Sequence, residues 1–251
     1  MPTVANNFGV LVPHAPPQSP PLAPARERAQ EAGLFRVRVW DLPTRVFHWS
    51  LAASLAGLAA TGYAGGAWME WHARLGSAVL ALLAFRIVWG CIGGRWSRFA
   101  SFLPTPAAVK AYLRGQAKPE QEAGHSPLGA LSVLAMLLVL FAQVATGLLS
   151  DDGGGFTGAL NDKVSSALAS AATLLHKQVG QWLLLGLVLL HVVAIAFYRI
   201  VRRRKLVRAM IGGDKLLPYR ASPARDDGAS RALAALVLCV CAAAVGWSVG
   251  Y

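Results

Sequence analysis

Long apolar blocks, rather than short alternating patterns, dominate the chain. Five of them approach or exceed the length of about 20 residues that an α-helix needs to cross a bilayer. They cover residues 43–64, 71–93, 127–149, 174–199 and 231–250. Lipid offers the backbone no hydrogen-bond partner, so a spanning segment is either a helix or a barrel strand. Because the apolar runs are continuous and lack a period of two, they predict five transmembrane helices.

The segments between these blocks divide the chain into three predicted parts. Residues 1–34 hold seven of the fourteen prolines and lack an apolar signal-peptide core, which predicts a disordered cytoplasmic tail. Residues 35–215 form the predicted membrane bundle, and 216–251 form a basic linker and a last span. Asp41 and Pro43 are suited to begin the first helix.

Shorter elements are predicted in two of the connections. Residues 105–114 favour a short helix in the loop between the second and third spans. The stretch SSALASAATLL, which precedes the fourth block, predicts either an external amphipathic helix or an outward extension of that span.

Composition and charge place the chain in a membrane. Hydrophobic residues make up 55% of the chain and charged residues only 14%, against about a quarter charged in soluble domains. The net charge of +12 does not point to nucleic acid, because Lys and Arg alternate from loop to loop as the positive-inside rule requires. This pattern predicts a cytoplasmic N-terminus and, after five spans, a C-terminus on the far side.

Four histidines fall into two pairs at different depths of the predicted bundle. His48 and His191 lie toward the cytoplasmic side, whereas His72 and His176 lie at the outer ends of their helices. The 15 residues between His176 and His191 correspond to about 22 Å along a regular α-helix, with a net rotation of about 60°. One helix can therefore contribute to two stacked sites.

Imidazole inside a membrane is costly, and it is a common axial ligand of haem iron. The pairs His48–His191 and His72–His176 are therefore predicted as the iron ligands of two b haems. No C-x-x-C-H motif is present, which excludes covalently attached c-type haem.

Further residues are predicted to support these haems. Gly76 and Gly180 follow the outer histidines at i+4, which would leave room for a flat macrocycle. Cations that could pair with haem propionates are Arg74, Lys177 and Arg86. For Arg86, which lies inside an apolar span, the alternative is an extended side chain that reaches the headgroups.

His125 is the exception among the membrane-associated histidines. It precedes Pro127 at the start of the third span, where it is badly placed to bind iron. We expect it to assist a propionate or a quinone near the inner haem. Ser126 and Arg98 are alternative hydrogen-bond donors to a quinone, and the sequence does not choose among the three.

The histidines lie in motifs that together resemble one family. The motifs are VRVWDLPTRVFHW, HARLG, FRIVWG, GHSPLGALSVLAMLLVLFAQVATGL and LHKQVGQWLLLGLVLLHVVAIAFY. From about residue 36 to residue 215, the chain resembles the bacterial cytochrome b561 / nickel–iron hydrogenase cytochrome b subunit family. The resemblance implies an all-α integral membrane four-helix haem-binding bundle plus a fifth C-terminal transmembrane helix. It also implies two b haems, with ligands at the positions of His48, His72, His176 and His191.

The resemblance further implies electron transfer in the bacterial inner membrane. The expected partners are a periplasmic redox protein (a hydrogenase, a c-type cytochrome or a similar protein), quinone and membrane lipid, with a homodimer as a further arrangement to test. Two other function classes stay open on the residues alone. One is a non-redox membrane anchor of a periplasmic oxidoreductase, and the other is an ion transporter that uses intramembrane histidines. The near absence of carboxylates from the spans disfavours transport.

Overall fold

The computed structural model describes residues 4–5, 11–12, 33–116, 123–151 and 153–250. Most of the tail that was predicted to be disordered lies outside these ranges. Its described residues include two short strands, β1 (Val4–Ala5) and β2 (Leu11–Val12), which pair antiparallel. The longer helices are α2 (Leu42–Ala64), α3 (Met69–Ile92), α6 (Pro127–Leu149), α8 (Gln181–Ile200) and α10 (Gly228–Val249). The shorter α-helices are α4 (Pro106–Leu113), α7 (Ser166–Leu174) and α9 (Leu206–Gly212), and 3₁₀ turns cover Gly66–Trp68, Phe99–Ser101 and Asn161–Lys163.

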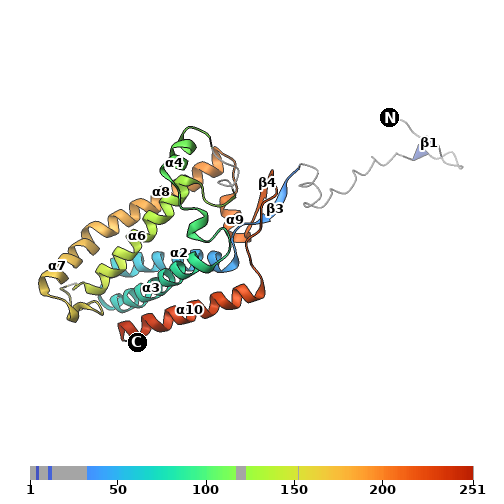
Figure 1. Cartoon of the computed structure of the whole chain (residues 1–251). Coiled ribbons are helices and arrows are strands. Elements are labelled where there is room, and N and C mark those ends of the chain that lie inside the picture. The colour runs from blue at the N-terminus through green and yellow to red at the C-terminus, as the bar shows by residue number, and fades with distance from the viewer. Residues whose placement is uncertain (1–3, 6–10, 13–32, 117–122, 152, 251) are drawn as a thin grey trace.

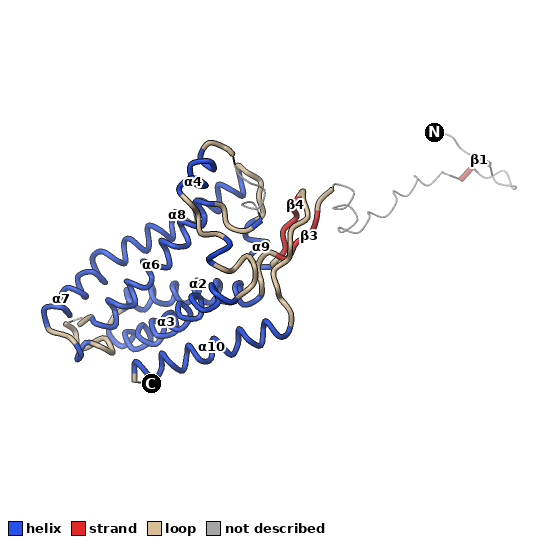
Figure 2. Tube along the Cα trace, viewed as in Figure 1, coloured by secondary structure: helices blue, strands red, loops and turns tan. Residues whose placement is uncertain are grey.

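Helix α3 is the centre of the bundle. It packs against α2, α10 and α6, and α8 packs in turn against α6 (Figures 1 and 2). Residues Val79 and Leu83 of α3 are fully buried and meet Leu140 of α6. On the other side, Phe85 and Trp89 pack with Phe47 of α2 and Ala234 of α10. The chain is therefore an all-α membrane bundle, as predicted.

Four helical segments in the described part of the chain are long and apolar enough to cross a membrane. They are Gly66–Ile92, Pro127–Leu149, Ser166–Ile200 and Gly228–Val249. Helix α2, predicted as the first of five spans, has 23 residues but is not among the four. Its polar positions, which include Arg45, His48 and Thr61, reduce its apolarity although it is long enough.

The fourth predicted span is longer and less regular than expected. Helices α7 and α8 are joined by a π-helical turn, Leu175–Gly180, so that the helical segment Ser166–Ile200 has 35 residues. The outward extension is thereby confirmed. The rotation of about 60° between His176 and His191 was calculated for a regular α-helix. That assumption is wrong, because His176 lies in a π-turn, which has i→i+5 hydrogen bonds and a wider turn.

A small antiparallel sheet, which the sequence did not predict, closes one end of the bundle. Strand β3 (Phe35–Arg38) precedes α2, and β4 (Asp214–Leu217) follows α9, with Arg38 opposite Asp214. Val37, Val39 and Trp40 pack there with Trp96 from the loop after α3. The sheet thus joins segments about 180 residues apart in the chain.

Acidic residues reinforce this closure. Asp214 accepts from Arg36 and Arg38 across the sheet, with closest N–O distances of 2.6 Å. Asp226 pairs with Arg38 at 2.6 Å and with Arg231 of α10 at 3.0 Å. Asp226 Oδ1 also accepts from the backbone N–H of Leu42 at 3.1 Å. The start of α2, the sheet and the start of α10 are therefore held by one ionic network.

Asp41, predicted to begin α2, has this role and is fully buried. Its Oδ1 accepts from the Thr44 backbone N–H at 2.8 Å and from Trp89 Nε1 at 3.3 Å. Its Oδ2 accepts from the Ser97 hydroxyl at 2.7 Å. One carboxylate therefore begins α2 and fixes the end of α3 beside it.

Replacing Asp41 by Ala should destabilise the protein by about 3 kcal/mol, because the change removes an N-cap and leaves the buried Nε1–H of Trp89 without its acceptor. Asp227 is the matched control, since it caps α10 through Ser230 N at 2.7 Å but is exposed. Asp227→Ala should cost only about 1 kcal/mol. Thermal unfolding in detergent compares the two, and equal losses would contradict the importance given to the buried network.

Candidate functional site

The outer pair of histidines comes from α3 and from the π-helical turn. His72 lies in the first turn of α3 and His176 in Leu175–Gly180. Their ring centroids are 6.2 Å apart, with an interplanar angle of 84°. The structure therefore brings these two imidazoles together from separate helices, with their ring planes nearly perpendicular.

The inner pair comes from α2 and α8. The ring centroids of His48 and His191 are 6.4 Å apart, with an interplanar angle of 50°. No residue of α8 is buried, and α8 packs within the bundle mainly against α6. His191 is itself half-buried, next to His48 of α2.

These separations fit a metal between the rings. A metal–nitrogen bond of about 2 Å, with about 1.2 Å from the nitrogen to the ring centre, places two imidazoles on opposite sides of one ion about 6.4 Å apart. Both pairs have this separation. In the described part of the chain, no cluster of three or more His, Cys, Asp or Glu could hold a metal, so the two-histidine sites fit haem iron better than a bare metal ion.

Backbone carbonyls hold the outer imidazoles. His72 Nδ1 is 3.0 Å from Leu58 O, and His176 Nδ1 is 2.9 Å from Gln143 O. A carbonyl oxygen can only accept, so Nδ1 donates in both rings, and Nε2 keeps the lone pair that a metal needs. Sequence reasoning did not identify these carbonyls, because a backbone acceptor leaves no mark in residue type.

The two glycines predicted to make room for a macrocycle differ. A Cβ added at Gly76 would have no heavy atom within 4 Å, so this position is open as expected. A Cβ added at Gly180 would collide with Oε1 of Gln143. The prediction for Gly180 is wrong, because the amide of Gln143 fills that space while its Nε2 donates to His176 O at 3.0 Å.

The predicted propionate partners lie in three different settings. Arg74 forms an ion pair with Glu70 and lies over the Trp71 ring. Lys177 is exposed beside His176. Arg86 is only 3% exposed, and its guanidinium lies 4.6 Å from the centre of the Phe99 ring. Arg86 therefore does not reach out to the headgroups, and its Nη1 has no hydrogen-bond partner among the described residues.

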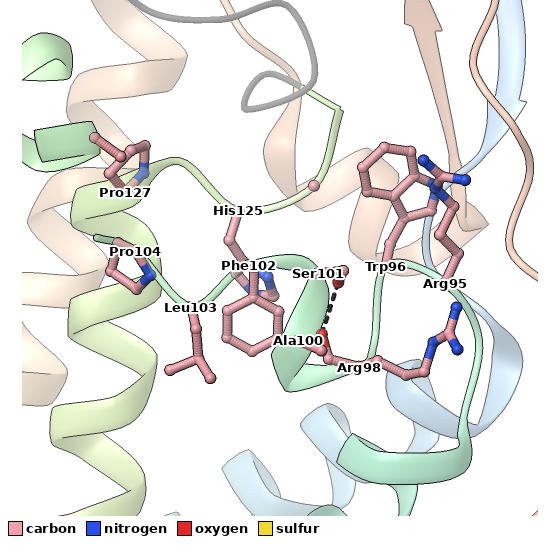
Figure 3. Close-up of a pocket in the computed structure, with 12 residues that line it drawn as sticks. Arg95, Trp96, Arg98, Ala100, Ser101, Phe102, Leu103, Pro104, His125 and Pro127 are labelled. Atoms are coloured by element: carbon pink, nitrogen blue, oxygen red, sulfur yellow. Dashed lines mark hydrogen bonds between the residues drawn. The ribbon is translucent and has the colours of Figure 1, made fainter.

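His125 lies in an aromatic setting beside a pocket. Its ring is 4.8 Å from Trp40 and 4.4 Å from Phe102, between centroids. It lines a pocket of about 450 Å³ together with Arg95, Arg98 and Ser101 (Figure 3). Burial, followed by the positive charges of Arg86 and Lys215, lowers the pKa of His125 to about 3. The imidazole is thus neutral at pH 7, and its buried Nδ1 has no partner among the described residues.

Comparison with known proteins identifies the family. A family model described as prokaryotic cytochrome b561 matches residues 39–213. The chain belongs to this family. No solved structure matches the chain.

Curated relatives carry the name "Probable Ni/Fe-hydrogenase B-type cytochrome subunit". The one from Azotobacter chroococcum mcd 1 is 26% identical over 210 residues, which cover 70% of this chain and 87% of the relative. The one from Rhizobium leguminosarum bv. viciae is 24% identical over 216 residues, covering 73% and 90%. The one from Rhodobacter capsulatus is 25% identical over 215 residues, covering 71% and 81%. This cytochrome b561 is therefore a membrane b-type cytochrome that carries haem and transfers electrons.

The pKa of His125 predicts how this cytochrome responds to acid. The unfolded chain binds a proton at His125 below about pH 6.5, whereas the folded chain does not until about pH 3. Stability therefore falls as the pH drops below 6.5, by about 1.4 kcal/mol per pH unit from this residue.

His125→Phe should remove that part of the acid sensitivity. Between pH 7.5 and pH 4.5 the wild type should lose about 2–3 kcal/mol more than the variant. Thermal melting of both proteins across this range measures the difference. Parallel curves for the two proteins would mean that His125 titrates normally in the folded state.

Proposed function

We propose that this cytochrome b561 binds two b haems and passes electrons between a periplasmic redox protein and the quinone pool of the bacterial inner membrane. The observation that carries the proposal is the presence of two histidine pairs, with ring centroids 6.2 and 6.4 Å apart. His72 and His176 hold the outer haem, and His48 and His191 hold the inner one. When bound, each haem supplies a one-electron redox centre.

The residues around the iron have positioning and insulating roles. The helices would hold the imidazoles in fixed positions around each haem. Gly76 leaves open space on α3 beside His72. Arg74, Lys177 and Arg86 supply positive charge that favours haem propionates. No side chain needs to act as a nucleophile or a general base.

We assign the orientation from the loops. Residues 199–208 (RIVRRRKLVR), which run into α9, are strongly basic. The sheet β3–β4 lies beside α9 at the same end of the bundle (Figure 1). The positive-inside rule assigns this end to the cytoplasm. Helix α2 then crosses the membrane as the first of five spans, with His48 toward the inner haem, and the C-terminus is periplasmic. Residues 35–215 form the di-haem unit, and residues 216–251 add a linker and a span.

The pocket beside His125 is our proposed quinone site. It lies in the cytoplasmic loops, and Arg98 and Ser101 line it with His125. A neutral imidazole can both donate and accept a hydrogen bond, which suits the carbonyl and hydroxyl forms of a quinone head group. Phe102 and Trp96 supply aromatic walls.

The periplasmic partner is proposed from the relatives. Their names describe subunits of Ni/Fe hydrogenases, and a hydrogenase at the outer face would deliver electrons to the outer haem.

The exposed apolar side chains of α8 and α10, such as Leu189, Phe197 and Trp247, are assigned to lipid.

Loss of one ligand from each pair should remove one haem only. His191→Ala and His72→Ala should each reduce the haem-to-protein ratio from about two to about one, because each change breaks one of two independent sites. Pyridine haemochrome analysis of purified protein gives the ratio, and His125→Phe is the control that keeps both haems. A wild-type protein without haem, grown with adequate haem supply, would favour the anchor function instead.

Removal of the polar lining of the pocket should slow exchange with quinone. Arg98→Ala and His125→Phe should each lower the rate of haem reduction by a quinol about tenfold, the equivalent of one lost hydrogen bond. Lys110→Ala, on the neighbouring apolar groove, is the matched control. Unchanged rates in the pocket variants, with both haems present, would place the quinone elsewhere.

A further inference from the structure

We infer that a repeated Ala-Thr-Gly segment, present once on α2 and once on α6, positions the two outer histidines and lowers the reduction potential of the haem between them. The inference rests on the proposed pairing of His72 with His176. The two copies read LAATG at residues 58–62 and QVATG at residues 143–147. Each copy ends two residues before its helix does, so the two helices present the same segment at the same level.

The same contacts occur in both copies. The carbonyl three residues before the threonine accepts from the histidine, at 3.0 Å for Leu58 O and 2.9 Å for Gln143 O. The threonine hydroxyl lies near the same nitrogen, at 3.3 Å for Thr61 and 3.5 Å for Thr146. In each copy, therefore, one backbone carbonyl oxygen and one threonine hydroxyl oxygen contact the Nδ1 of the histidine.

The threonine proton is used elsewhere. Thr61 Oγ1 donates to Gly57 O at 2.7 Å, and Thr146 Oγ1 donates to Ala142 O at 2.7 Å. Because the hydroxyl hydrogen points back along the helix, the oxygen can only accept from the imidazole. Each Nδ1–H thus faces two acceptors, which fixes the tautomer with Nε2 free for iron.

The glycine of each copy leaves the space that the histidine ring occupies. A Cβ added at Gly62 would lie 3.1 Å from His72 Cε1, and one at Gly147 would lie 2.9 Å from His176 Cε1. Any larger residue would push the imidazole away from its carbonyl. The glycine and the threonine therefore act together: one lets the ring approach, and the other helps to hold it.

The inner pair lacks this arrangement. His48 Nδ1 is buried without a hydrogen-bond partner among the described residues. A hydrogen bond from Nδ1–H to a strong acceptor raises the basicity of the ligand. A more basic axial ligand favours ferric over ferrous iron, which lowers the reduction potential. The segment should therefore tune the outer haem and leave the inner haem unchanged.

The test uses redox titration of the haem absorbance in the wild type and in the His191→Ala background, which retains only the outer haem. Thr61→Val and Thr146→Val keep the side-chain shape but remove the hydroxyl. Each should raise the midpoint potential of the outer haem, and the double variant should raise it further. Ser77→Ala is the matched control, since the Ser77 hydroxyl donates to Ala73 O of its own helix at 3.1 Å. Within the described residues it forms no hydrogen bond to a histidine.

Gly147→Ala provides a second measurement that does not depend on potential. It should change the low-spin ferric signal of the outer haem in electron paramagnetic resonance, because His176 must tilt. The inference fails if the threonine variants shift the potential no more than Ser77→Ala, or if Gly147→Ala leaves the signal unchanged. Failure of the proposed pairing is distinct: the His191→Ala protein would then hold no haem or two haems, whatever residues 61 and 146 are.

Discussion

The constraint on which the rest of this cytochrome depends is the approach of two imidazole rings from separate helices, with centroids slightly more than 6 Å apart. That spacing suits one iron between the rings, and it must be kept at two levels of the bundle. Helix α8, which carries His191, packs mainly against α6 and continues from the π-helical turn that carries His176. The position of α8 is therefore set by α6 and by that turn.

Helices α2 and α3 carry the other histidine of each pair, His48 and His72. Helix α3 carries His72 and is packed on three sides, so it forms the rigid reference of the bundle. Asp41 begins α2 and bonds to the loop after α3, which places His48 almost two turns further along α2. Gly213, at the end of α9, accepts from the backbone N–H groups of Val39 and Trp40 at 2.9 and 3.0 Å. The end that carries the basic loops is therefore braced by backbone and ionic contacts.

Much of this architecture can be read from the sequence. The apolar blocks gave the ends of α2, α3, α6 and α10 to within three residues, because lipid leaves a spanning backbone few alternatives. The position of Asp41 before Pro43 predicted the start of α2. Comparing the depths of the histidines gave the two neighbouring pairs, although iron binding by them stays a prediction.

Other features depend on contacts that residue types do not show. The π-helical turn at Leu175–Gly180 lies in a uniformly apolar stretch, where no polar position marks the change of period. Strands β3 and β4 are four residues each and meet only after the chain has folded. Gly180 makes room for Gln143, a contact that requires both helices in place. The Ala-Thr-Gly repeat is present in the sequence. Its contact with the histidines becomes apparent only in the folded structure.

The most direct measurement is the position of iron in the purified protein, from anomalous scattering in crystals. The account predicts two iron peaks, one between His48 and His191 and one between His72 and His176, each about 3.2 Å from both ring centres. A single peak, or an iron bound at His125, would contradict it.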